Sequence, residues 1–265
     1  MTGGDRLRLD GRTVVVTGGA GFLGRQWTSA LLAAGAEVVV LDVVPAPEAQ
    51  PGVRHEQVDI TDAAAVGAVA ARLADDGVRV DVLVNNAAVD APVTAEGLAS
   101  GERFETFAPE RWDRELAVGL TGAFLCSQAF GPAMADRGRG VIVNIASDLA
   151  LVGPDQGLYR VDGLADDAQP VKPVTYPVVK SALLGLTRYL ATYWGDRGVR
   201  ANTLCLGGVE RDQDAGFLER IAQRIPLGRM ASPGEYGEAL VFLCSDASSY
   251  MTGSCLVLDG GRTAW

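Results

Sequence analysis

The stretch TVVVTGGAGFLGRQWTSALLAAG, residues 13–35, decides the fold. A β-branched run leads into a glycine-rich turn, and an apolar, helix-forming segment follows. Gly18, Gly21 and Gly24 are spaced so that the backbone can approach a pyrophosphate at the N-terminus of the helix. A tight turn without a ligand is the alternative. The strand before the turn and the helix after it are the context that dinucleotide binding requires, so we predict a dinucleotide site here.

Strand-like and helix-like segments alternate along the rest of the chain, with short turns between them. The strand candidates are rich in Val, Leu and Ile, as expected for strands buried on both faces. This alternation predicts an α/β fold with a Rossmann-type, doubly wound, seven-stranded parallel sheet and helices on both faces. We expect strands at residues 13–17, 37–41, 53–58, 82–84, 141–145, 200–205 and 254–258, and helices at 22–34, 62–74, 109–135, 174–193 and 233–244.

The length and composition fit one domain. With 265 residues, 48% of them hydrophobic, the chain can bury an ample core, and we find no repeat, linker or low-complexity tract. Residues 1–265 are therefore expected to form a single dinucleotide-binding and catalytic domain. No apolar run reaches the roughly 20 residues of a membrane span, and the first residues lack the apolar segment of a signal peptide. A cytoplasmic protein is expected.

Charge and metal-binding residue types argue against several classes of function. The net charge of −10 argues against a nucleic acid or an anionic membrane as partner. The single histidine, His55, cannot complete a zinc site or a Ser/His/Asp triad, and the four cysteines lack metal-ligand spacing, so we predict no metal. We expect the cysteines to be reduced and buried; they are Cys126, Cys205, Cys244 and Cys255.

The second expected strand is followed by Asp42, eighteen positions after Gly24, where an acidic residue is expected to accept hydrogen bonds from the ribose of a dinucleotide. A 2′-phosphate beside this carboxylate would cost on the order of 4 kcal/mol at a separation of about 4 Å and an effective dielectric of about 20. Val43 and Val44 supply no compensating cation. The sequence therefore predicts NAD as the cofactor, with a surface strand cap as the alternative role of Asp42.

Tyr176 and Lys180, four residues apart in TYPVVKSALLGL, form a candidate acid/base pair. Removing a proton from an alcohol while a hydride leaves its carbon requires a base near the working pH. A free tyrosine has a pKa of about 10, and a lysine ammonium one helical turn away is expected to lower it. Alone, the tyrosine would be interpreted as a packing residue and the lysine as a solvated charge. Their occurrence together, downstream of Ser147, favours catalysis.

The motifs resemble, in order and over nearly the whole chain, those of the short-chain dehydrogenase/reductase family in its single-domain type. The series is TGGAGFLG, Asp42, VDITD with Asp59, LVNNAA, VNIAS ending on Ser147, Tyr176 with Lys180, VRANTLCLGGV and MTGSCLVLDGG. The resemblance implies an NAD(P)-dependent interconversion of an alcohol and a ketone. It implies Tyr176 as general acid/base, Lys180 on the nicotinamide ribose and Ser147 on the substrate oxygen. It also implies cofactor contacts at Gly18, Gly21, Phe22, Leu23, Gly24, Asp42, Asp59, Ile60, Asn86, Ala87, Ala88, Tyr176, Lys180 and Val209.

Three departures from the family pattern concern the cofactor and the proton path. Phe22 stands where single-domain members usually have a glycine, and the resulting TGxxGxxG spacing is more typical of a larger, sugar-nucleotide-modifying branch. Gly119 stands where the family generally has an asparagine that takes part in a proton relay, and we hypothesise that the relay survives through water. Leu206 replaces a common proline, and the charged residues 210–212 replace a threonine that usually follows.

A fourth departure is an insertion beside the expected active site. Ser147 and Tyr176 are 29 positions apart, far more than in the common family pattern. We expect substrate loops at about residues 148–175 and 208–230, and active-site loops of such length usually serve function. The polar, acidic composition of the first loop suits a hydroxyl-rich ligand, with an idle solvated loop as the alternative. The expected substrate residues are Asp148, Arg160, Glu210 and Arg211.

The favoured interpretation is an NAD-dependent oxidoreductase for a secondary alcohol on a polar ring. The substrate is expected to be a sugar, amino sugar or sugar phosphate, as in the bacterial sugar-modifying members that the chain resembles. The glycine spacing leaves a sugar-nucleotide epimerase or dehydratase open, and Gly119 leaves a non-catalytic NAD-binding sensor open. Apolar positions around Phe124 and Leu186, and the C-terminal strand and tail, predict a homodimer or homotetramer, unless they face the sheet.

Overall fold

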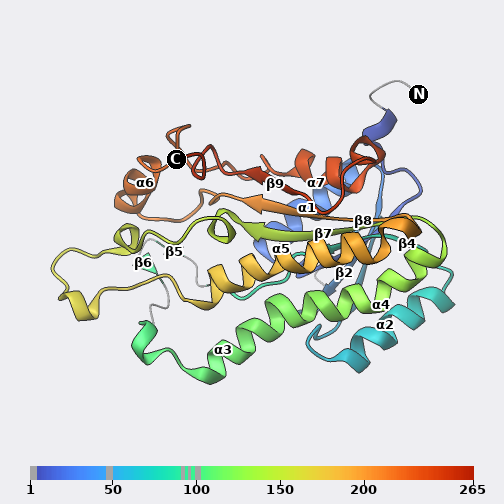
Figure 1. Ribbon diagram of the computed structural model, residues 1–265, viewed down its shortest axis with the longest axis horizontal. Coiled ribbons are helices and arrows are strands. Elements are labelled where there is room, and N and C mark those ends of the chain that lie inside the picture. The colour runs from blue at the N-terminus through green and yellow to red at the C-terminus, as the bar shows by residue number, and fades with distance from the viewer. Residues whose placement is uncertain (1–4, 46–49, 91–92, 95–96, 99–102) are drawn as a thin grey trace.

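The computed structural model describes residues 5–45, 50–90, 93–94, 97–98 and 103–265 of the chain, and its centre is one parallel sheet (Figure 1). The seven strands lie in the order β3-β2-β1-β4-β7-β8-β9, and every neighbouring pair is parallel. The expected seven-stranded, doubly wound sheet is confirmed. The strands are β1 Thr13–Thr17, β2 Glu37–Asp42, β3 Val53–Gln57, β4 Val80–Asn85, β7 Gly140–Ser147, β8 Val199–Leu206 and β9 Cys255–Leu258.

The chain reverses its direction of travel across the sheet between β1 and β4. From β1 it moves outward through β2 and β3, and it then returns to pair β4 with the other edge of β1. In an open α/β sheet, such a reversal leaves a crevice beyond the carboxyl ends of the two strands, where ligands bind. The glycine turn follows β1 and the segment Asn86–Ala88 follows β4, so both expected cofactor segments lie at this crevice.

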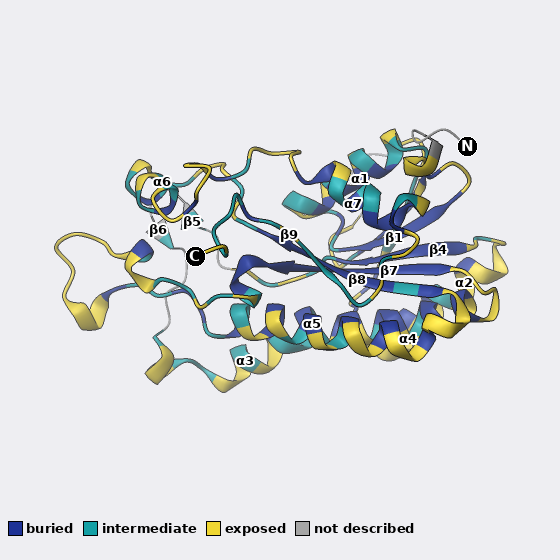
Figure 2. Cartoon of the chain, turned by 45° about the horizontal axis from the view of Figure 1, so that its top comes forward, coloured by how far each residue is buried: buried dark blue, intermediate teal, exposed yellow. Residues whose placement is uncertain are grey.

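Helices cover both faces of the sheet (Figures 1 and 2). On one face, Trp27 of α1 and Leu240 of α7 are fully buried in one apolar cluster. On the other, Phe130 and Met134 of α4 and Leu190 of α5 belong to a second cluster. The main helices are α1 Phe22–Ala33, α2 Ala63–Asp75, α3 Pro109–Leu116, α4 Gly122–Asp136, α5 Thr175–Trp194, α6 Ala215–Ala222 and α7 Gly237–Cys244.

The structure refines several sequence-based boundaries. The helix expected at 109–135 is continuous, but a π-helical turn, Ala117–Thr121, separates its α-helical parts, α3 and α4. The helix expected at 233–244 begins at Gly237, because the preceding residues form turns. Helix α6 lies inside the expected loop 208–230, and its eight residues are too few for a strong periodic signal. A two-stranded hairpin, β5 Val93–Thr94 and β6 Gly97–Leu98, was also not predicted.

The continuous helical segment Pro109–Asp136 is long and apolar enough to cross a membrane by length and composition alone. It has 28 residues and a mean hydropathy of 1.3 in its most apolar window, which corrects the expectation that no such stretch exists. That expectation missed it because Thr121, Ser127 and Gln128 interrupt the apolar residues. Cys126 and Met134 of this segment are fully buried in the core, and a core helix passes the same test.

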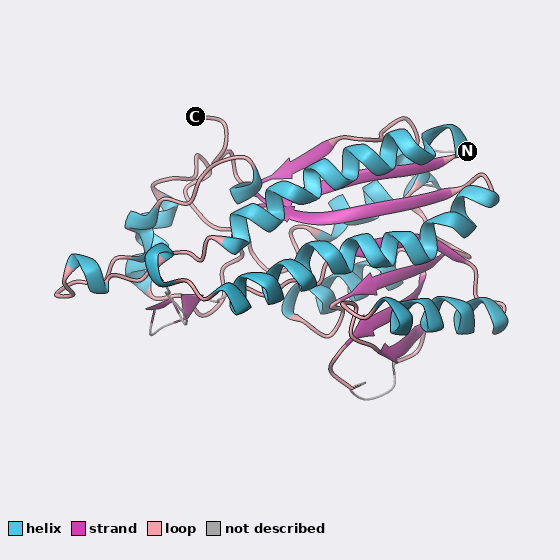
Figure 3. Cartoon of the chain, turned by 60° about the horizontal axis from the view of Figure 1, so that its bottom comes forward, coloured by secondary structure: helices cyan, strands magenta, loops and turns pink. Residues whose placement is uncertain are grey.

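The loops that follow the strands gather at one end of the molecule (Figure 3). There, Leu158 of the insertion packs with Phe217 and Ile221 of α6 and with Ile225 and Met230, which form a separate apolar cluster. The acidic residues at the insertion's tip are exposed (Figure 2). The insertion therefore has an apolar inner side, which its polar composition did not suggest.

Candidate functional site

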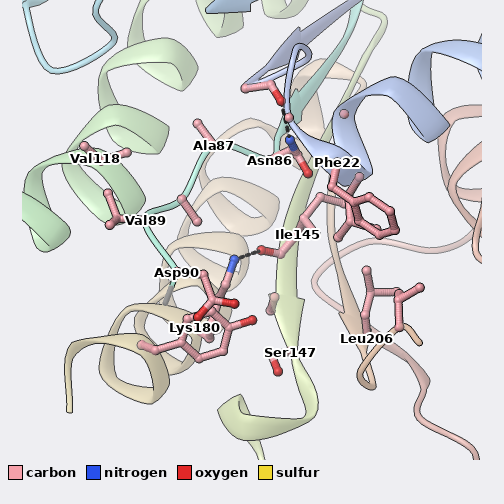
Figure 4. A pocket seen from close by; sticks show the side chains of 18 of the residues that line it. Phe22, Asn86, Ala87, Val89, Asp90, Val118, Ile145, Ser147, Lys180 and Leu206 are labelled. Atoms are coloured by element: carbon pink, nitrogen blue, oxygen red, sulfur yellow. Dashed lines mark hydrogen bonds between the residues drawn. The ribbon is translucent and has the colours of Figure 1, made fainter. Parts of the chain in front are cut away.

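A pocket of about 780 Å³ runs from the glycine turn to the insertion and α6. Figure 4 shows part of its lining, including Phe22, Ser147 and Lys180. This volume lies in the range of about 300–1,000 Å³ that is usual for small-molecule and cofactor sites. Its walls include Asp42 and Asp59 at one end, Ser147 and Tyr176 further along, and Phe217 of α6. The structure thus brings the expected cofactor and catalytic residues to one continuous pocket.

The glycine turn is shaped by close backbone contacts. Gly18 has φ +65°, and a Cβ there would lie 2.9 Å from the Cα atom of Ala87. A Cβ on Gly24 would overlap the carbonyl oxygen of Gly18. Gly21 is the N-cap of α1, and the first residues of this helix, Phe22, Leu23 and Gly24, line the pocket. These observations explain the glycines at positions 18 and 24 and fit a pyrophosphate at the helix N-terminus.

The side chain of Asn86, directly after β4, forms hydrogen bonds to the glycine turn. Its amide nitrogen donates to the carbonyl oxygens of Thr17 (2.9 Å) and Gly18 (3.1 Å), and its amide oxygen accepts from Trp27 Nε1 (2.8 Å). Thr17 Oγ1 accepts the backbone N–H groups of Asn86 and Ala87. The side chain of Asn86 is therefore structural, and the backbone of this segment lines the pocket.

Asp42 lies where an adenosine ribose is expected. Its Oδ2 accepts the backbone N–H of Ala20 (2.9 Å) and its Oδ1 that of Val44 (3.1 Å). A carboxylate has about four lone-pair sites, so both oxygens keep capacity for a ribose hydroxyl. Asp59 and Ile60 line the pocket nearby, and Oδ1 of Asp59 accepts both donors of Thr61.

Ser147, Tyr176 and Lys180 come together at the end of β7 and the start of α5. Nζ of Lys180 lies 5.6 Å from the centre of the Tyr176 ring and donates to the carbonyl oxygen of Ile145 at 2.9 Å (Figure 4). Lys180 is buried, whereas Tyr176 keeps partial exposure to the pocket. Tyr176 and Lys180 are one turn apart on α5, which places both beside the last residues of β7.

Burial dominates the electrostatics of this group. It raises the pKa of Tyr176 well above 10, and the carboxylate of Asp90 raises it further, while the Ser147 hydroxyl lowers it. Burial lowers the pKa of Lys180 to about 8, and Asp90 acts against that shift. The direction for Tyr176 is opposite to the lowering expected from the sequence. Desolvation of the phenolate exceeds the effect of the nearby hydrogen bond in this environment.

Asp148 is part of the protein scaffold around Ser147. Its Oδ1 accepts the Ser147 hydroxyl at 2.7 Å and the backbone N–H of Leu149 at 2.8 Å. Its Oδ2 accepts Arg262 Nη1 at 2.6 Å. Asp148, expected as a substrate contact, lines the pocket, but it is only 2% exposed and its two oxygens already accept three hydrogen bonds. Its place in the structure favours orienting Ser147.

The other expected substrate residues divide into two groups. Arg211 lines the pocket and stacks its guanidinium 4.7 Å from the centre of the Phe22 ring. Val209, expected at the nicotinamide, also lines the pocket and bridges to Ala231. Arg160 lies outside the pocket lining, exposed and paired with Asp166 at 2.5 Å. Glu210 is also exposed and outside the lining.

Sequence reasoning did not assign several charged pocket residues to the site, among them Arg262, Asp90 and Lys172. Arg262 lies in the segment after β9, and its position gave no signal for a contact with Asp148. Asp90 follows the LVNNAA motif by two residues and lines the same wall as Lys180 (Figure 4). Lys172 was noted only as a charge of the insertion, and it also lines the pocket. The spacing of Asp90 from the end of β4 was the one usable signal.

Gly119 occupies the centre of the π-helical turn and is buried. A Cβ at this position would lie 2.6 Å from Cγ1 of Val179, which sits between Tyr176 and Lys180 on α5. A second cavity, of about 10 Å³, is bounded by Gly119, Tyr176 and Lys180 among others. That is close to the smallest space that holds one water molecule. π-Helical turns are frequent at functional sites.

Comparison with known proteins agrees with this geometry. The family model described as short chain dehydrogenase matches residues 12–159, and the one described as Enoyl-(Acyl carrier protein) reductase matches residues 164–263. D-threitol dehydrogenase of Mycolicibacterium smegmatis is 36% identical, over 97% of this chain and 95% of that protein. The chain therefore belongs to the short-chain dehydrogenase family, and it is an oxidoreductase of that family.

Two solved structures are similar over nearly the full chain. A short chain dehydrogenase from Leptospira borgpetersenii with bound NAD⁺ has a TM-score of 0.85 and 27% identity, with 97% of this chain and 94% of that chain covered. A gluconate 5-dehydrogenase from Burkholderia cenocepacia in complex with NADP and tartrate has a TM-score of 0.81 and 28% identity, with 99% of each chain covered. Relatives of this fold thus bind NAD⁺ or NADP.

Proposed function

We propose that this protein is an NAD-dependent dehydrogenase that interconverts a secondary alcohol and a ketone on a polyol or sugar. The observation that carries the proposal is the convergence of Ser147, Tyr176 and Lys180 in one pocket with the glycine turn and Asp42. The pocket is large enough for a dinucleotide with a small substrate beside it. The relatives named for threitol and gluconate support a hydroxyl-rich substrate.

In this proposal Tyr176 removes the proton from the substrate hydroxyl, and it returns the proton in the reverse direction. The dinucleotide supplies the acceptor for the hydride that leaves the carbinol carbon. Ser147 positions the substrate oxygen, because a hydroxyl has one donor and two acceptor sites and can contact the substrate while bonded to Asp148. Lys180, held by the carbonyl oxygen of Ile145, would contact the nicotinamide ribose, and its positive charge would act against the rise that burial causes in the pKa of Tyr176.

NAD is the proposed dinucleotide because of Asp42. This carboxylate lines the pocket beside Val43 and Val44, and its two oxygens are fixed by Ala20 and Val44 N–H groups. A 2′-phosphate placed beside it would meet a charge of the same sign. The glycine turn would hold the pyrophosphate, and Asp59 and Ile60 would contact the adenine.

The test measures cofactor absorbance with NAD and with NADP, using threitol, gluconate, amino sugars and sugar phosphates as substrates. We expect NADH formation on a polyol or sugar. Tyr176→Phe is expected to lower kcat/KM by a factor of about 10² to 10⁴. The control is Tyr250→Phe, which removes the hydroxyl of a fully exposed tyrosine. Tight NAD binding without turnover would overturn the proposal in favour of a sensor, and sugar isomerisation without net NADH would favour an epimerase.

We further propose that the protein is a homodimer or homotetramer that pairs through α4 and α5. Phe124 of α4 and Tyr189 and Tyr193 of α5 are between 46% and 62% exposed, and the two tyrosine rings stack at 5.6 Å. Exposed apolar groups of this kind often mark an interface. The variant Tyr189→Asp is expected to dissociate the oligomer. Light scattering measures its molar mass, and a mass equal to that of wild type would exclude this face as the interface.

The expected cytoplasmic location also remains a proposal. The four cysteines are free, three of them are buried and Cys255 is partly buried. Free thiols are typical of a reducing compartment. Fractionation of cells that produce the protein, with the activity above as the marker, would test it.

A further inference from the structure

The insertion places a lysine directly against the proposed acid/base. Nζ of Lys172 lies 4.2 Å from the centre of the Tyr176 ring and 2.5 Å from Oδ1 of Asp90. The Lys172 side chain is 8% exposed, whereas that of Asp90 is 45% exposed. Both residues line the main pocket together with Ser147. The pair therefore belongs to the pocket wall next to the reacting centre.

The insertion is folded so that Lys172 is held in this place. Gln156 accepts the backbone N–H of Lys172 at 2.8 Å. The buried side chain of Gln169 accepts the N–H of Val161 and donates to the carbonyl oxygens of Val161 and Leu164. A buried lysine without a partner is costly, so this arrangement depends on Asp90. These hydrogen bonds fix the conformation of the insertion and hold Lys172 at the pocket wall.

The pair keeps unused hydrogen-bonding capacity toward the pocket. A lysine ammonium has three donors, and among the described residues Nζ of Lys172 bonds to Asp90 alone. Oδ2 of Asp90 accepts no hydrogen bond within the part of the chain that the structure describes. A hydroxyl group both donates and accepts, so one hydroxyl can accept from Lys172 while donating to Asp90.

We propose that Asp90 and Lys172 form a subsite for the hydroxyl on the carbon next to the reacting carbinol. The enzyme then prefers vicinal diols over otherwise equal mono-alcohols. This inference rests on the proposed function, because the reacting carbinol is placed by Ser147 and Tyr176. The two groups lie on the wall that already contacts Tyr176, so a substrate bound at the tyrosine presents its neighbouring carbon to them.

A purely structural role makes a different prediction. A cation over an aromatic face stabilises the ring's position whatever the substrate. If Lys172 only braced Tyr176, its removal would slow diols and mono-alcohols by the same factor. A subsite is specific to the second hydroxyl, because a substrate that lacks it leaves the buried polar groups unpaired. The ratio of the two rates therefore separates the roles.

The experiment compares kcat/KM for 1,2-cyclohexanediol and for cyclohexanol, which differ by one hydroxyl. Wild type is expected to favour the diol. In Lys172→Met and in Asp90→Asn the diol-to-cyclohexanol ratio is expected to fall by about tenfold or more, in line with the loss of a hydrogen bond to a charged group. Lys172→Arg, which keeps the charge, is expected to recover part of the ratio. An unchanged ratio in both variants overturns the subsite.

Two controls keep the outcomes distinct. Arg197→Met removes a surface partner of Asp136 at the same 2.5 Å separation and is expected to leave the ratio as in wild type. The proposed function is judged by the polyol and sugar assay above; if wild type oxidises neither of the two cyclohexane alcohols, the subsite is judged by binding. Calorimetric titration of 1,2-cyclohexanediol into wild type and Lys172→Met, each with NAD, decides it. Weaker binding to the variant supports the subsite, and equal affinity overturns it.

Discussion

Arg262 Nη1 donates to Oδ2 of Asp148 at 2.6 Å, across 114 positions of the chain. The Arg262 side chain is 13% exposed and that of Asp148 is 3% exposed, so the ion pair is largely buried from solvent. Asp148 also accepts the Ser147 hydroxyl. The segment that follows β9 therefore supplies the positive charge that compensates the Asp148 carboxylate next to Ser147. Local sequence motifs do not reveal this contact.

Removing the arginine is predicted to destabilise the fold. Arg262→Met leaves the buried Asp148 carboxylate without its cation, and breaking such a pair costs about 3–5 kcal/mol of the free energy of unfolding. Urea denaturation followed by circular dichroism measures the change. Arg139→Met is the matched control, because its partner Asp246 and the arginine itself are more than half exposed. The control is expected to lose less than about 1 kcal/mol. Equal losses would contradict a special role for the buried pair.

Asp42 is predicted to set the cofactor preference. Asp42→Asn removes the negative charge and keeps a side-chain oxygen for one of the two N–H groups, Ala20 or Val44, that the carboxylate accepts. The ratio of kcat/KM for NADP to that for NAD is expected to rise by about tenfold or more, because the repulsion removed is on the order of a few kcal/mol. Steady-state kinetics with both cofactors measures it, and the thermal midpoint serves as a control for folding. A wild type that already prefers NADP would rule out this role.

Lys180 is predicted to make stability depend on pH. Burial lowers its pKa from 10.5 to about 8. Below about pH 8 the folded protein carries a buried charge that opposes folding, and between about 8 and 10.5 only the unfolded state keeps the proton. Stability therefore rises with pH in this window, by about 3 kcal/mol in total at about 1.36 kcal/mol per pH unit.

The matched measurement uses Lys180→Met, which lacks this titration. The difference in free energy of unfolding, wild type minus Lys180→Met, is expected to increase between pH 7 and pH 10. Tyr176 has the opposite effect: above about pH 10 the unfolded state loses its tyrosine proton while the folded state keeps it, so stability falls as pH rises. Both proteins contain Tyr176, so taking the difference cancels this contribution. A difference that stays flat over this range would show that Lys180 keeps an ordinary pKa.

The sequence predicts the fold well because buried parallel strands leave a strong local signal. The run at 13–17 coincides with β1, and the glycine turn and Asp42 mark the ends of the first two strands. Tyr176 and Lys180 were recognisable because one helical turn joins them. Arg262 and Lys172 were not, since their contacts with Asp148 and Tyr176 depend on tertiary packing. Composition also did not show that the acidic residues at the insertion's tip are exposed while Leu158 packs against Phe217 and Ile221 of α6.

Val179 is predicted to leave no room for any side chain larger than that of glycine at position 119. The Cβ of Gly119→Ala would lie 2.6 Å from Cγ1 of Val179, so the alanine would displace the turn of α5 that carries Tyr176 and Lys180. Overpacking of this kind costs about 1–3 kcal/mol of stability. Activity is also expected to fall, because small misplacements of catalytic groups lower turnover strongly.

The double variant Gly119→Ala with Val179→Ala separates this contact from other roles of the glycine. Val179→Ala removes the clashing methyl, so the double variant is expected to be more stable and more active than the two single effects added together. Denaturation and kcat/KM of the four proteins give this coupling. Strict additivity would show that the alanine acts elsewhere, for example on the water-sized cavity beside Lys180, and a fully active Gly119→Ala would show that the turn tolerates the methyl group.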